Sequence, residues 1–243
     1  MKRIFAIVLV ILMIFSACVV VNADVVSKDT KTDNRITAYT AHLKRLFDKG
    51  GLKGRITHVG IADLSKDYQP ELFYITKAKS SMKSTFHVCG YDGDDVFDYE
   101  IDTNYIGYGP GSITLKRKIS RLSGDYRWVI YSVGKNASGR KEELHNVFTR
   151  SGDTMNNEMK FRLTWSTGKT KAYRYSIDGI ETVKSTYDTA IDKFYNEFQP
   201  ASTSHYKNEG VVKKVANRKK RASVVNALNA AASGWKALTP VTK

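Results

Sequence analysis

Short runs of alternating apolar and polar residues fill the middle of this 243-residue sequence and constrain its fold more than any other feature. From Ile56 onward the hydrophobic period is two, and glycine, asparagine and serine separate the runs. Such alternation predicts half-buried strands, and their short, even spacing favours an antiparallel meander of about eight strands. The candidate strands are His58–Asp63, Glu71–Thr76, Ser84–Gly90, Val96–Asp102, Ser112–Ile119, Arg127–Val133, Glu143–Arg150, Lys160–Ser166 and Ala172–Ile177.

Apolar residues at helical spacing flank this strand-rich region. Asn34 is a candidate cap for a helix over residues 35–49, and Ser185 is the candidate cap of a closing helix over residues 186–198. The apolar positions are Ile36, Tyr39, Leu43, Leu46 and Phe47 in the first helix and Tyr187, Ile191, Phe194, Tyr195 and Phe198 in the second. The expected fold class is α+β, with an N-terminal helix, an antiparallel β meander of about eight strands, a C-terminal packing helix and a basic tail.

Residues 1–23 have the pattern of an export signal. Lys2 and Arg3 precede an apolar run that begins at Ile4, and Val21-Asn22-Ala23 is a small-residue cleavage site. A permanent membrane-spanning helix over Ile4–Val21 is the alternative interpretation. The signal predicts a secreted or envelope-associated protein.

The two cysteines bear on how this exported chain matures. Phe15-Ser16-Ala17-Cys18 resembles a bacterial lipobox, so lipidation at Cys18 is an alternative to plain cleavage after Ala23. After that cleavage Cys89 is the only cysteine left, which excludes an intramolecular disulfide. We interpret Cys89 as a small buried hydrophobe in a strand, with a reactive thiol as the alternative.

Positive charge is concentrated near the C-terminus. The chain has 39 basic and 24 acidic residues, a net charge of +15, and the segment 201–243 alone carries +8. We therefore divide the chain into a signal peptide (1–23), a linker (24–34), an α+β domain (35–200) and a basic tail with some helical spacing (201–243).

Two short motifs resemble a group of poorly characterised exported proteins of Gram-positive bacteria. The first runs from Asp63 to Leu72 and is similar to the D-x-D-x-D-x-x-P-E-L loop of that group, with Ser65 in place of the second aspartate. The second runs from Tyr173 to Val183 and is similar to the group's terminal Y-x-I-x-G-x-x-V hairpin, which leads into a helix. The resemblance implies an envelope or secreted location and brings no known catalytic residue.

The first motif also has the alternate-position oxygens of a calcium loop. Asp63, Ser65 and Asp67 are the candidate ligands, with a backbone carbonyl near Gln69. Because Ser65 replaces a carboxylate and Tyr74 stands where a bidentate glutamate is needed, we expect weak Ca²⁺ binding at best and no other cofactor. We favour a structural turn in which Asp63 and Asp67 bond backbone amides and Pro70 closes the loop, with weak Ca²⁺ binding as the alternative.

Familiar catalytic motifs are missing from the sequence. It contains no G-x-S-x-G, H-E-x-x-H, P-loop or dinucleotide fingerprint, and no paired cysteines for a zinc site. The five histidines lack ligand spacing: His42, His58, His87, His145 and His205. Carboxylate pairs of the glycosidase kind stay open, because their separation is set in space rather than in sequence. We expect a protein that binds rather than one that catalyses.

Aromatic and basic residues supply the candidate binding surfaces. Tyr108 lies in a glycine-rich loop that can present its ring to solvent, whereas the strand aromatics can equally face the core. The basic candidates in the tail are Lys213, Lys214, Arg218, Lys219, Lys220 and Arg221. The expected partner is an anionic envelope polymer or membrane surface, or an extracellular protein or glycan, and the export signal argues against nucleic acid. A flexible, solvated tail is the alternative.

The sequence thus favours an exported, non-catalytic envelope or extracellular binding module. A secreted hydrolase with carboxylate chemistry and a structural envelope component are the alternatives. Exposed aromatic residues in a row favour the binding module, whereas a cleft with convergent acids of shifted pKa favours the hydrolase.

Overall fold

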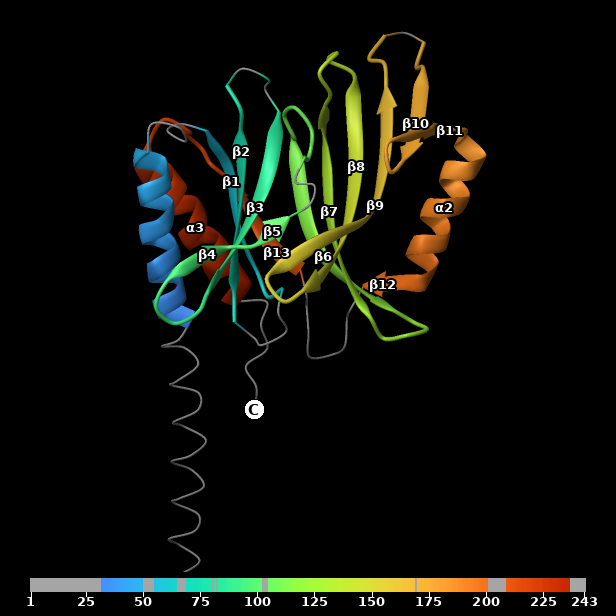
Figure 1. Ribbon diagram of the computed structural model, residues 1–243. Coiled ribbons are helices and arrows are strands. Elements are labelled where there is room, and N and C mark those ends of the chain that lie inside the picture. Colours follow the sequence, from blue (N-terminus) through green and yellow to red (C-terminus); the bar gives the residue numbers. More distant parts are fainter. Residues whose placement is uncertain are drawn as a thin grey trace, which may run out of the picture.

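A single antiparallel-rich sheet of thirteen strands dominates the protein (Figure 1). The structure is a computed structural model that describes residues 32–49, 55–64, 69–79, 81, 83–101, 105–168, 170–200 and 209–236. The strands are β1 (Ile56–Ala62), β2 (Glu71–Lys77), β3 (Ser84–Tyr91), β4 (Val96–Asp98), β5 (Glu100–Ile101), β6 (Ser112–Ser120), β7 (Tyr126–Lys135), β8 (Lys141–Ser151), β9 (Thr154–Trp165), β10 (Tyr173–Ile177), β11 (Ile180–Thr182), β12 (Phe198–Pro200) and β13 (Glu209–Lys214). The expected α+β meander of about eight strands is therefore wrong, because the described chain is β-rich and adds only short helices.

A strand from the C-terminal segment enters the middle of the sheet. The strand order is β11-β10-β9-β8-β7-β6-β13-β1-β2-β3-β4, so β13 joins two halves that are separate in sequence. Gly210 of β13 lies opposite Leu115, and a Cβ atom on Gly210 would lie 3.0 Å from the Leu115 side chain and 3.1 Å from the Ala62 Cβ. Glycine permits this close approach. The expectation of a basic tail outside the fold is wrong for the described residues 209–236.

Helix boundaries also differ from the sequence-based expectation. The N-terminal helix covers residues 32–48, so Asn34 lies inside it rather than at its start. Helix α2 (Lys184–Glu197) has Val183 at its N-cap and no side-chain cap bond, so Ser185 is not a cap. Phe198 already belongs to β12 and pairs with β6. Packing of one apolar stripe, rather than a polar cap, holds α2 in place.

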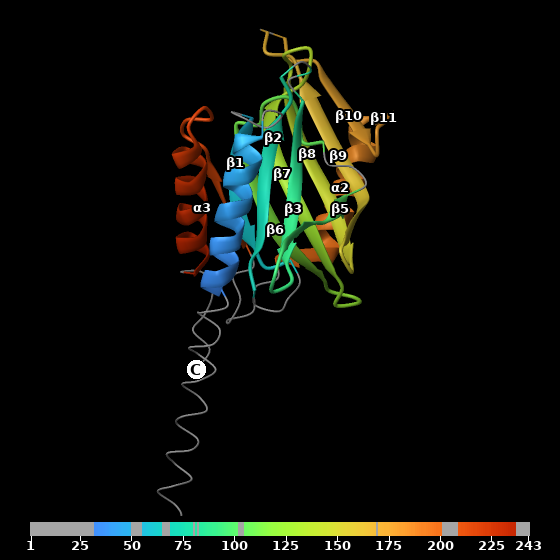
Figure 2. The same ribbon diagram turned by 60° about the vertical axis from the view of Figure 1, so that its left-hand side comes forward.

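Helices cover two regions of the same face of the sheet, which we call the outer face. The N-terminal helix and α3 (Arg221–Lys236) lie side by side at one end, and α2 covers the other end (Figures 1 and 2). The first helix pair packs on a cluster that includes Tyr39, Leu43, Val59, Ile61, Leu72, Val224, Leu228 and Trp235. Helix α2 packs on a cluster that includes Val129, Val147, Phe161, Tyr187 and Phe194.

The opposite, inner face encloses a third apolar cluster because the sheet curls on itself. Phe86 of β3 and Phe148 of β8 are distant in the strand order, yet their ring centroids lie 5.1 Å apart in an edge-to-face pair. Tyr99 and Ile106, from the described residues between β4 and β6, are buried in the same cluster. One core therefore joins both halves of the sheet.

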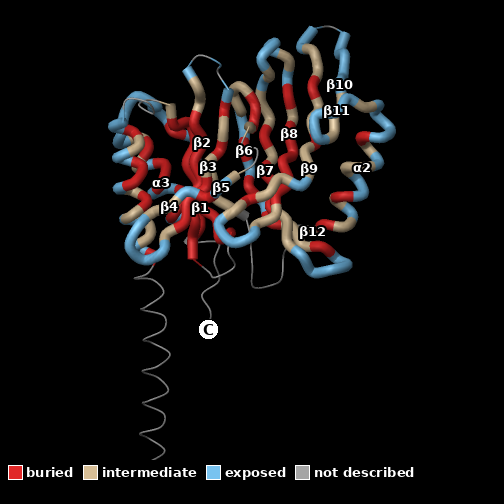
Figure 3. The backbone as a smooth tube through the Cα atoms, viewed as in Figure 1, coloured by how far each residue is buried: buried red, intermediate tan, exposed pale blue. Residues whose placement is uncertain are grey.

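Burial is unequal along the sheet. Every residue of β1 is buried, whereas β10 and β11 contain only exposed and half-buried residues (Figure 3). The inner face is thus left open to ligands at the β9–β11 end.

Within the described ranges, none of the helices has the length and apolar character needed to cross a membrane. The export signal, Cys18 and the proposed cleavage site lie outside those ranges.

Candidate functional site

Polar side chains gather on the inner face where β8, β9 and β10 run together. The register places Leu144 opposite Arg162, and Arg162 opposite Ser176. Directly paired residues on neighbouring strands project from the same face, so these positions form one row across the sheet. Lys160 and Thr164, two residues either side of Arg162, share its face.

Two cavities open along this row. One, of about 460 Å³, is lined by residues that include Tyr105, Leu144, Lys160 and Asp178, and the other, of about 220 Å³, lies toward the strand ends. The smaller cavity has no aliphatic side chain in its lining: Asn136, Ser138, Arg140, Arg162, Thr164, Arg174, Tyr175, Ser176, Gly179 and Glu181. Because both cavities share Arg162, Ser176 and Gly179, they form one continuous depression, which we call the Arg162 groove.

A buried ion pair forms the floor of the groove. Glu142 is only 2% exposed, and the Arg162 guanidinium donates to its Oε1 from Nε at 2.6 Å. The Tyr105 hydroxyl donates to Glu142 Oε2 at 3.3 Å. Burial raises the pKa of the Glu142 carboxyl, and the Arg162 and Tyr105 contacts oppose that rise. Glu142 therefore fixes the direction of Arg162 and leaves part of its guanidinium facing the groove.

Lys160 supplies a second cation beside Arg162. Burial lowers the pKa of its ammonium group, and the positive charges of Arg162 and Lys83 lower it further, whereas Asp178 and Glu142 act in the opposite direction. The neighbouring turn is built by Asp178, with φ of 51°, and Gly179, with φ of 86°. Asp178 Oδ1 also accepts a 2.7 Å hydrogen bond from the Lys160 backbone N–H, which ties the turn to the rim of the groove.

Two more arginines, Arg140 and Arg174, line the smaller cavity. Arg140 donates to the Ala172 carbonyl, and its backbone N–H donates to Asn136 Oδ1 at 3.0 Å. Arg174 is exposed on β10. The groove therefore combines four cations with the carboxylates of Glu158, Asp178 and Glu181, and Glu158 forms an ion pair with Arg127. Charged and hydroxyl groups, rather than an apolar pocket, are what it offers to a ligand.

Tyr108 lies next to the groove rather than in it. Its ring packs edge-to-face on Tyr105 with centroids 5.8 Å apart, and Tyr105 lines the larger cavity.

A separate row of stacked rings lies on the outer face of strands β9 and β10. Tyr173, which is 47% exposed, stacks on Trp165 at 6.5 Å and on Tyr175 at 6.4 Å. Both faces of this end of the sheet thus carry groups suited to contact with a polymer.

The expected calcium loop is only partly described. Asp63 follows β1 and is buried, while Ser65 and Asp67 lie outside the described residues. Weak Ca²⁺ binding at Asp63, Ser65 and Asp67 therefore stays a prediction.

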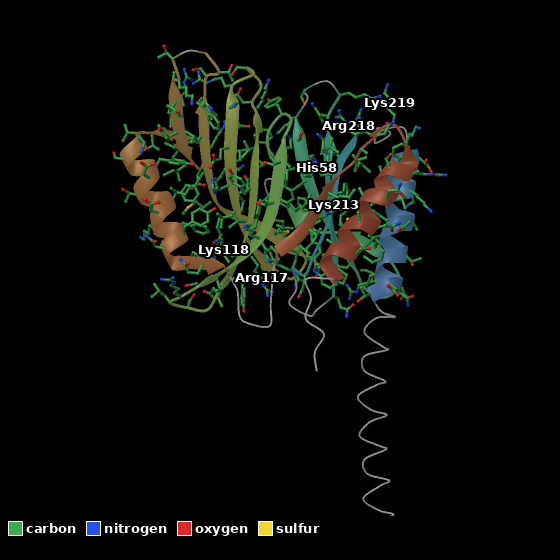
Figure 4. All side chains as sticks on the ribbon, turned by 180° about the vertical axis from the view of Figure 1, so that it is seen from behind. His58, Arg117, Lys118, Lys213, Arg218 and Lys219 are labelled. Carbon is green, nitrogen blue, oxygen red and sulfur yellow. The ribbon has the colours of Figure 1, made fainter. Side chains whose placement is uncertain are left out.

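The six basic residues of the C-terminal segment do not form one surface. Lys213 and Lys214 are neighbours on β13 and so point to opposite faces. Arg218 and Lys219 lie beyond the strand end, and Figure 4 shows them far from Arg117 and Lys118 on β6. Arg221 forms a 2.7 Å ion pair with Asp48 that links α3 to the N-terminal helix, while Lys220 is exposed just before α3.

The described histidines occupy separate environments. His145 contacts Tyr195 OH at 2.6 Å and Glu143 Oε1 at 2.9 Å on the outer face. His42 instead lies with Cys89 and Asp98, and the potential ligand atoms of these three residues are all within 4.8 Å of one another. This is the group of side chains in the described chain that could hold a metal ion.

Sequence reasoning missed Glu142, Lys160, Arg162 and the His42–Cys89–Asp98 group. The available signal for the groove is the alternation of polar residues along β8, β9 and β10, which by itself is also typical of a solvated strand face.

Comparison of the chain with protein-family models, with curated proteins and with solved structures found no match.

Proposed function

We propose that this protein is a non-catalytic binding module of the cell envelope or extracellular space, and that its Arg162 groove holds a segment of an anionic, hydroxyl-rich polymer. The observation that carries the proposal is the lining of the groove, in which the four cations Arg140, Lys160, Arg162 and Arg174 outnumber the three carboxylates and stand among hydroxyl and amide side chains. One of those carboxylates, Glu158, is already paired with Arg127. Guanidinium groups bind carboxylates and phosphates through paired hydrogen bonds, which gives orientation as well as attraction.

The shape of the groove supports an extended ligand. Two cavities joined at Arg162 can accommodate successive units of a chain, and the hydroxyl groups of Ser138, Thr164 and Ser176 can bond to sugar hydroxyls between the charged contacts. An acidic glycan meets both requirements. A neutral glycan would bring no carboxylate or phosphate to the exposed guanidinium groups, and a lipid tail would meet no aliphatic wall in the smaller cavity.

The hydrolase alternative receives less support from the same residues. Carboxylate catalysis needs an acid that can reach the ligand with a free oxygen. Glu142 is the carboxyl beside the groove whose pKa is raised by burial, but it is deeply buried, and its two oxygens accept hydrogen bonds from Arg162 and from Tyr105. Its arrangement suits the positioning of Arg162 rather than proton transfer.

Calorimetric titration with oligogalacturonate, a carboxylated glycan, tests the proposal. We expect saturable binding that weakens at high salt, and no binding of the uncharged glycan dextran. Arg174→Gln should weaken binding about tenfold or more, because a hydrogen bond to a charged group contributes about 1.5–3 kcal/mol. Arg121→Gln removes an exposed arginine from the β6–β7 turn, away from the groove, and serves as the matched control. Equal losses for both variants would show that only net charge matters and would refute the groove.

A further inference from the structure

Three different donor atoms converge where the N-terminal helix meets the β3–β4 hairpin. Cys89 of β3 is the direct antiparallel partner of Asp98 of β4, which places both side chains on one face. His42 projects onto them from the helix. Cys89 Sγ lies 3.1 Å from Asp98 Oδ1 and 3.9 Å from His42 Nε2.

These separations are close to the edges of a metal coordination polyhedron, and the three potential ligand atoms are all within 4.8 Å of one another. Zinc binds cysteine sulfur at about 2.3 Å and histidine nitrogen or carboxylate oxygen at about 2.0–2.2 Å in tetrahedral geometry, which sets the sulfur about 3.5–3.7 Å from each of the other two ligand atoms. The two measured distances lie on either side of that range. We infer that His42, Cys89 and Asp98 form a binding site for a divalent transition metal, with Zn²⁺ as the best fit.

The donor set selects the class of metal. Sulfur, imidazole nitrogen and carboxylate oxygen together suit Zn²⁺, whereas Ca²⁺ and Mg²⁺ take oxygen ligands. The site is thus distinct in chemistry and in place from the expected calcium loop. Three protein ligands leave a fourth tetrahedral position open.

Burial supports a site that is formed before the metal arrives. Cys89 is 0% exposed and His42 is 6% exposed, while Asp98 is exposed and gives the metal a route from solvent. Without metal the Cys89 thiol donates its hydrogen bond to Asp98. Metal binding replaces that proton, which is released to solvent as the thiolate coordinates.

The neighbouring charges limit the affinity. Arg45 Nη2 lies 3.4 Å from His42 Nδ1, and coordination through Nε2 places the imidazole proton on Nδ1. Arg45 must then turn away, which its exposed position on the helix allows.

His87 is the other histidine near the site. Its Nε2 is already engaged by Thr76 Oγ1 at 2.9 Å, and its ring stacks on Tyr74, so it is not a fourth ligand in this arrangement.

Titration of the untagged protein with Co²⁺, a spectroscopic substitute for Zn²⁺, tests the inference. Zn²⁺ is then added to displace the bound Co²⁺. We expect one equivalent to bind with a thiolate-to-metal charge-transfer band. Cys89→Ser should abolish the band, and the exposed-ligand variant Asp98→Asn, which keeps an acceptor for the thiol, should weaken binding at least tenfold. Arg45→Gln should tighten binding, because it removes a positive charge that faces the site.

Matched variants locate the metal and keep the test independent of folding. Asp95→Asn lies in the same hairpin but outside the group, and Cys18→Ser removes the other thiol of the chain, so both should bind as the unmodified protein does. A band that survives Cys89→Ser, an affinity unchanged by Asp98→Asn in a folded variant, or no saturable binding at all would overturn the inference. None of these results bears on the Arg162 groove.

Discussion

At the scale of single residues, burial decides chemistry that the sequence leaves open. The sequence predicts that Cys89 is a small buried residue in a strand, and its complete burial in β3 confirms this. Burial also raises the pKa of its thiol, which opposes nucleophilic reactivity in the metal-free protein. By contrast, the roles of Glu142 and Arg162 could not be predicted, because nothing local shows which polar strand residues meet across the sheet.

His58 should make the stability of the protein depend on pH. It is buried on β1, and burial together with Lys214 and Arg218 lowers its pKa to about 4. Between about pH 6.5 and pH 4 the unfolded chain binds a proton that the folded chain does not, so stability falls as the pH falls. The loss attributable to His58 should reach up to about 3 kcal/mol.

Urea unfolding at pH 7, 5 and 4 checks this prediction. The variant His58→Gln has no proton to gain, so its free energy of unfolding should fall less steeply with decreasing pH than that of the unmodified protein. Parallel pH profiles for the two proteins would show that His58 titrates normally in the fold. The difference between the profiles isolates His58 from His42 and His87, whose pKa values burial also lowers.

At the scale of elements, local patterns located most strands but not β12 and β13. Each of the nine predicted runs overlaps an observed strand, and Val96–Asp102 overlaps both β4 and β5. β11 has only three residues and lies within the hairpin expected over Tyr173–Val183, whereas β12, also of three residues, is too short for a pattern to appear. The local composition of β13, with Lys213 and Lys214, indicates a basic tail, whereas its pairing with β1 and β6 is non-local and leaves no local pattern.

Helix α3 should therefore contribute to the stability of the whole domain. Leu228 is completely buried against the N-terminal helix and β1 cluster, so Leu228→Ala should lower the free energy of unfolding by about 2–5 kcal/mol. Asn229→Ala changes an exposed neighbour on the same helix and should have little effect. Circular dichroism should report one shared transition. Early loss of helix signal, with the sheet signal unchanged, would instead show that α3 docks as a separate unit.

At the scale of the whole molecule, the curvature of the sheet and the length of its last strands create the groove. The outer face is covered by helices near both ends, and the inner face closes on itself around Phe86 and Phe148. β10 and β11 extend past this closure and keep their inner face open, with Arg174 and Ser176 on it. Polymer binding is therefore predicted for one end of the molecule only.

Mapping of backbone amide shifts during titration with oligogalacturonate tests this account most directly, because it reports where the ligand lies as well as whether it binds. We predict that the largest shifts fall on Arg162, Ser176 and Gly179, where the two cavities meet. Amide shifts confined to residues 213–221, or to Tyr173, whose ring lies on the outer face, would contradict the groove as the binding site.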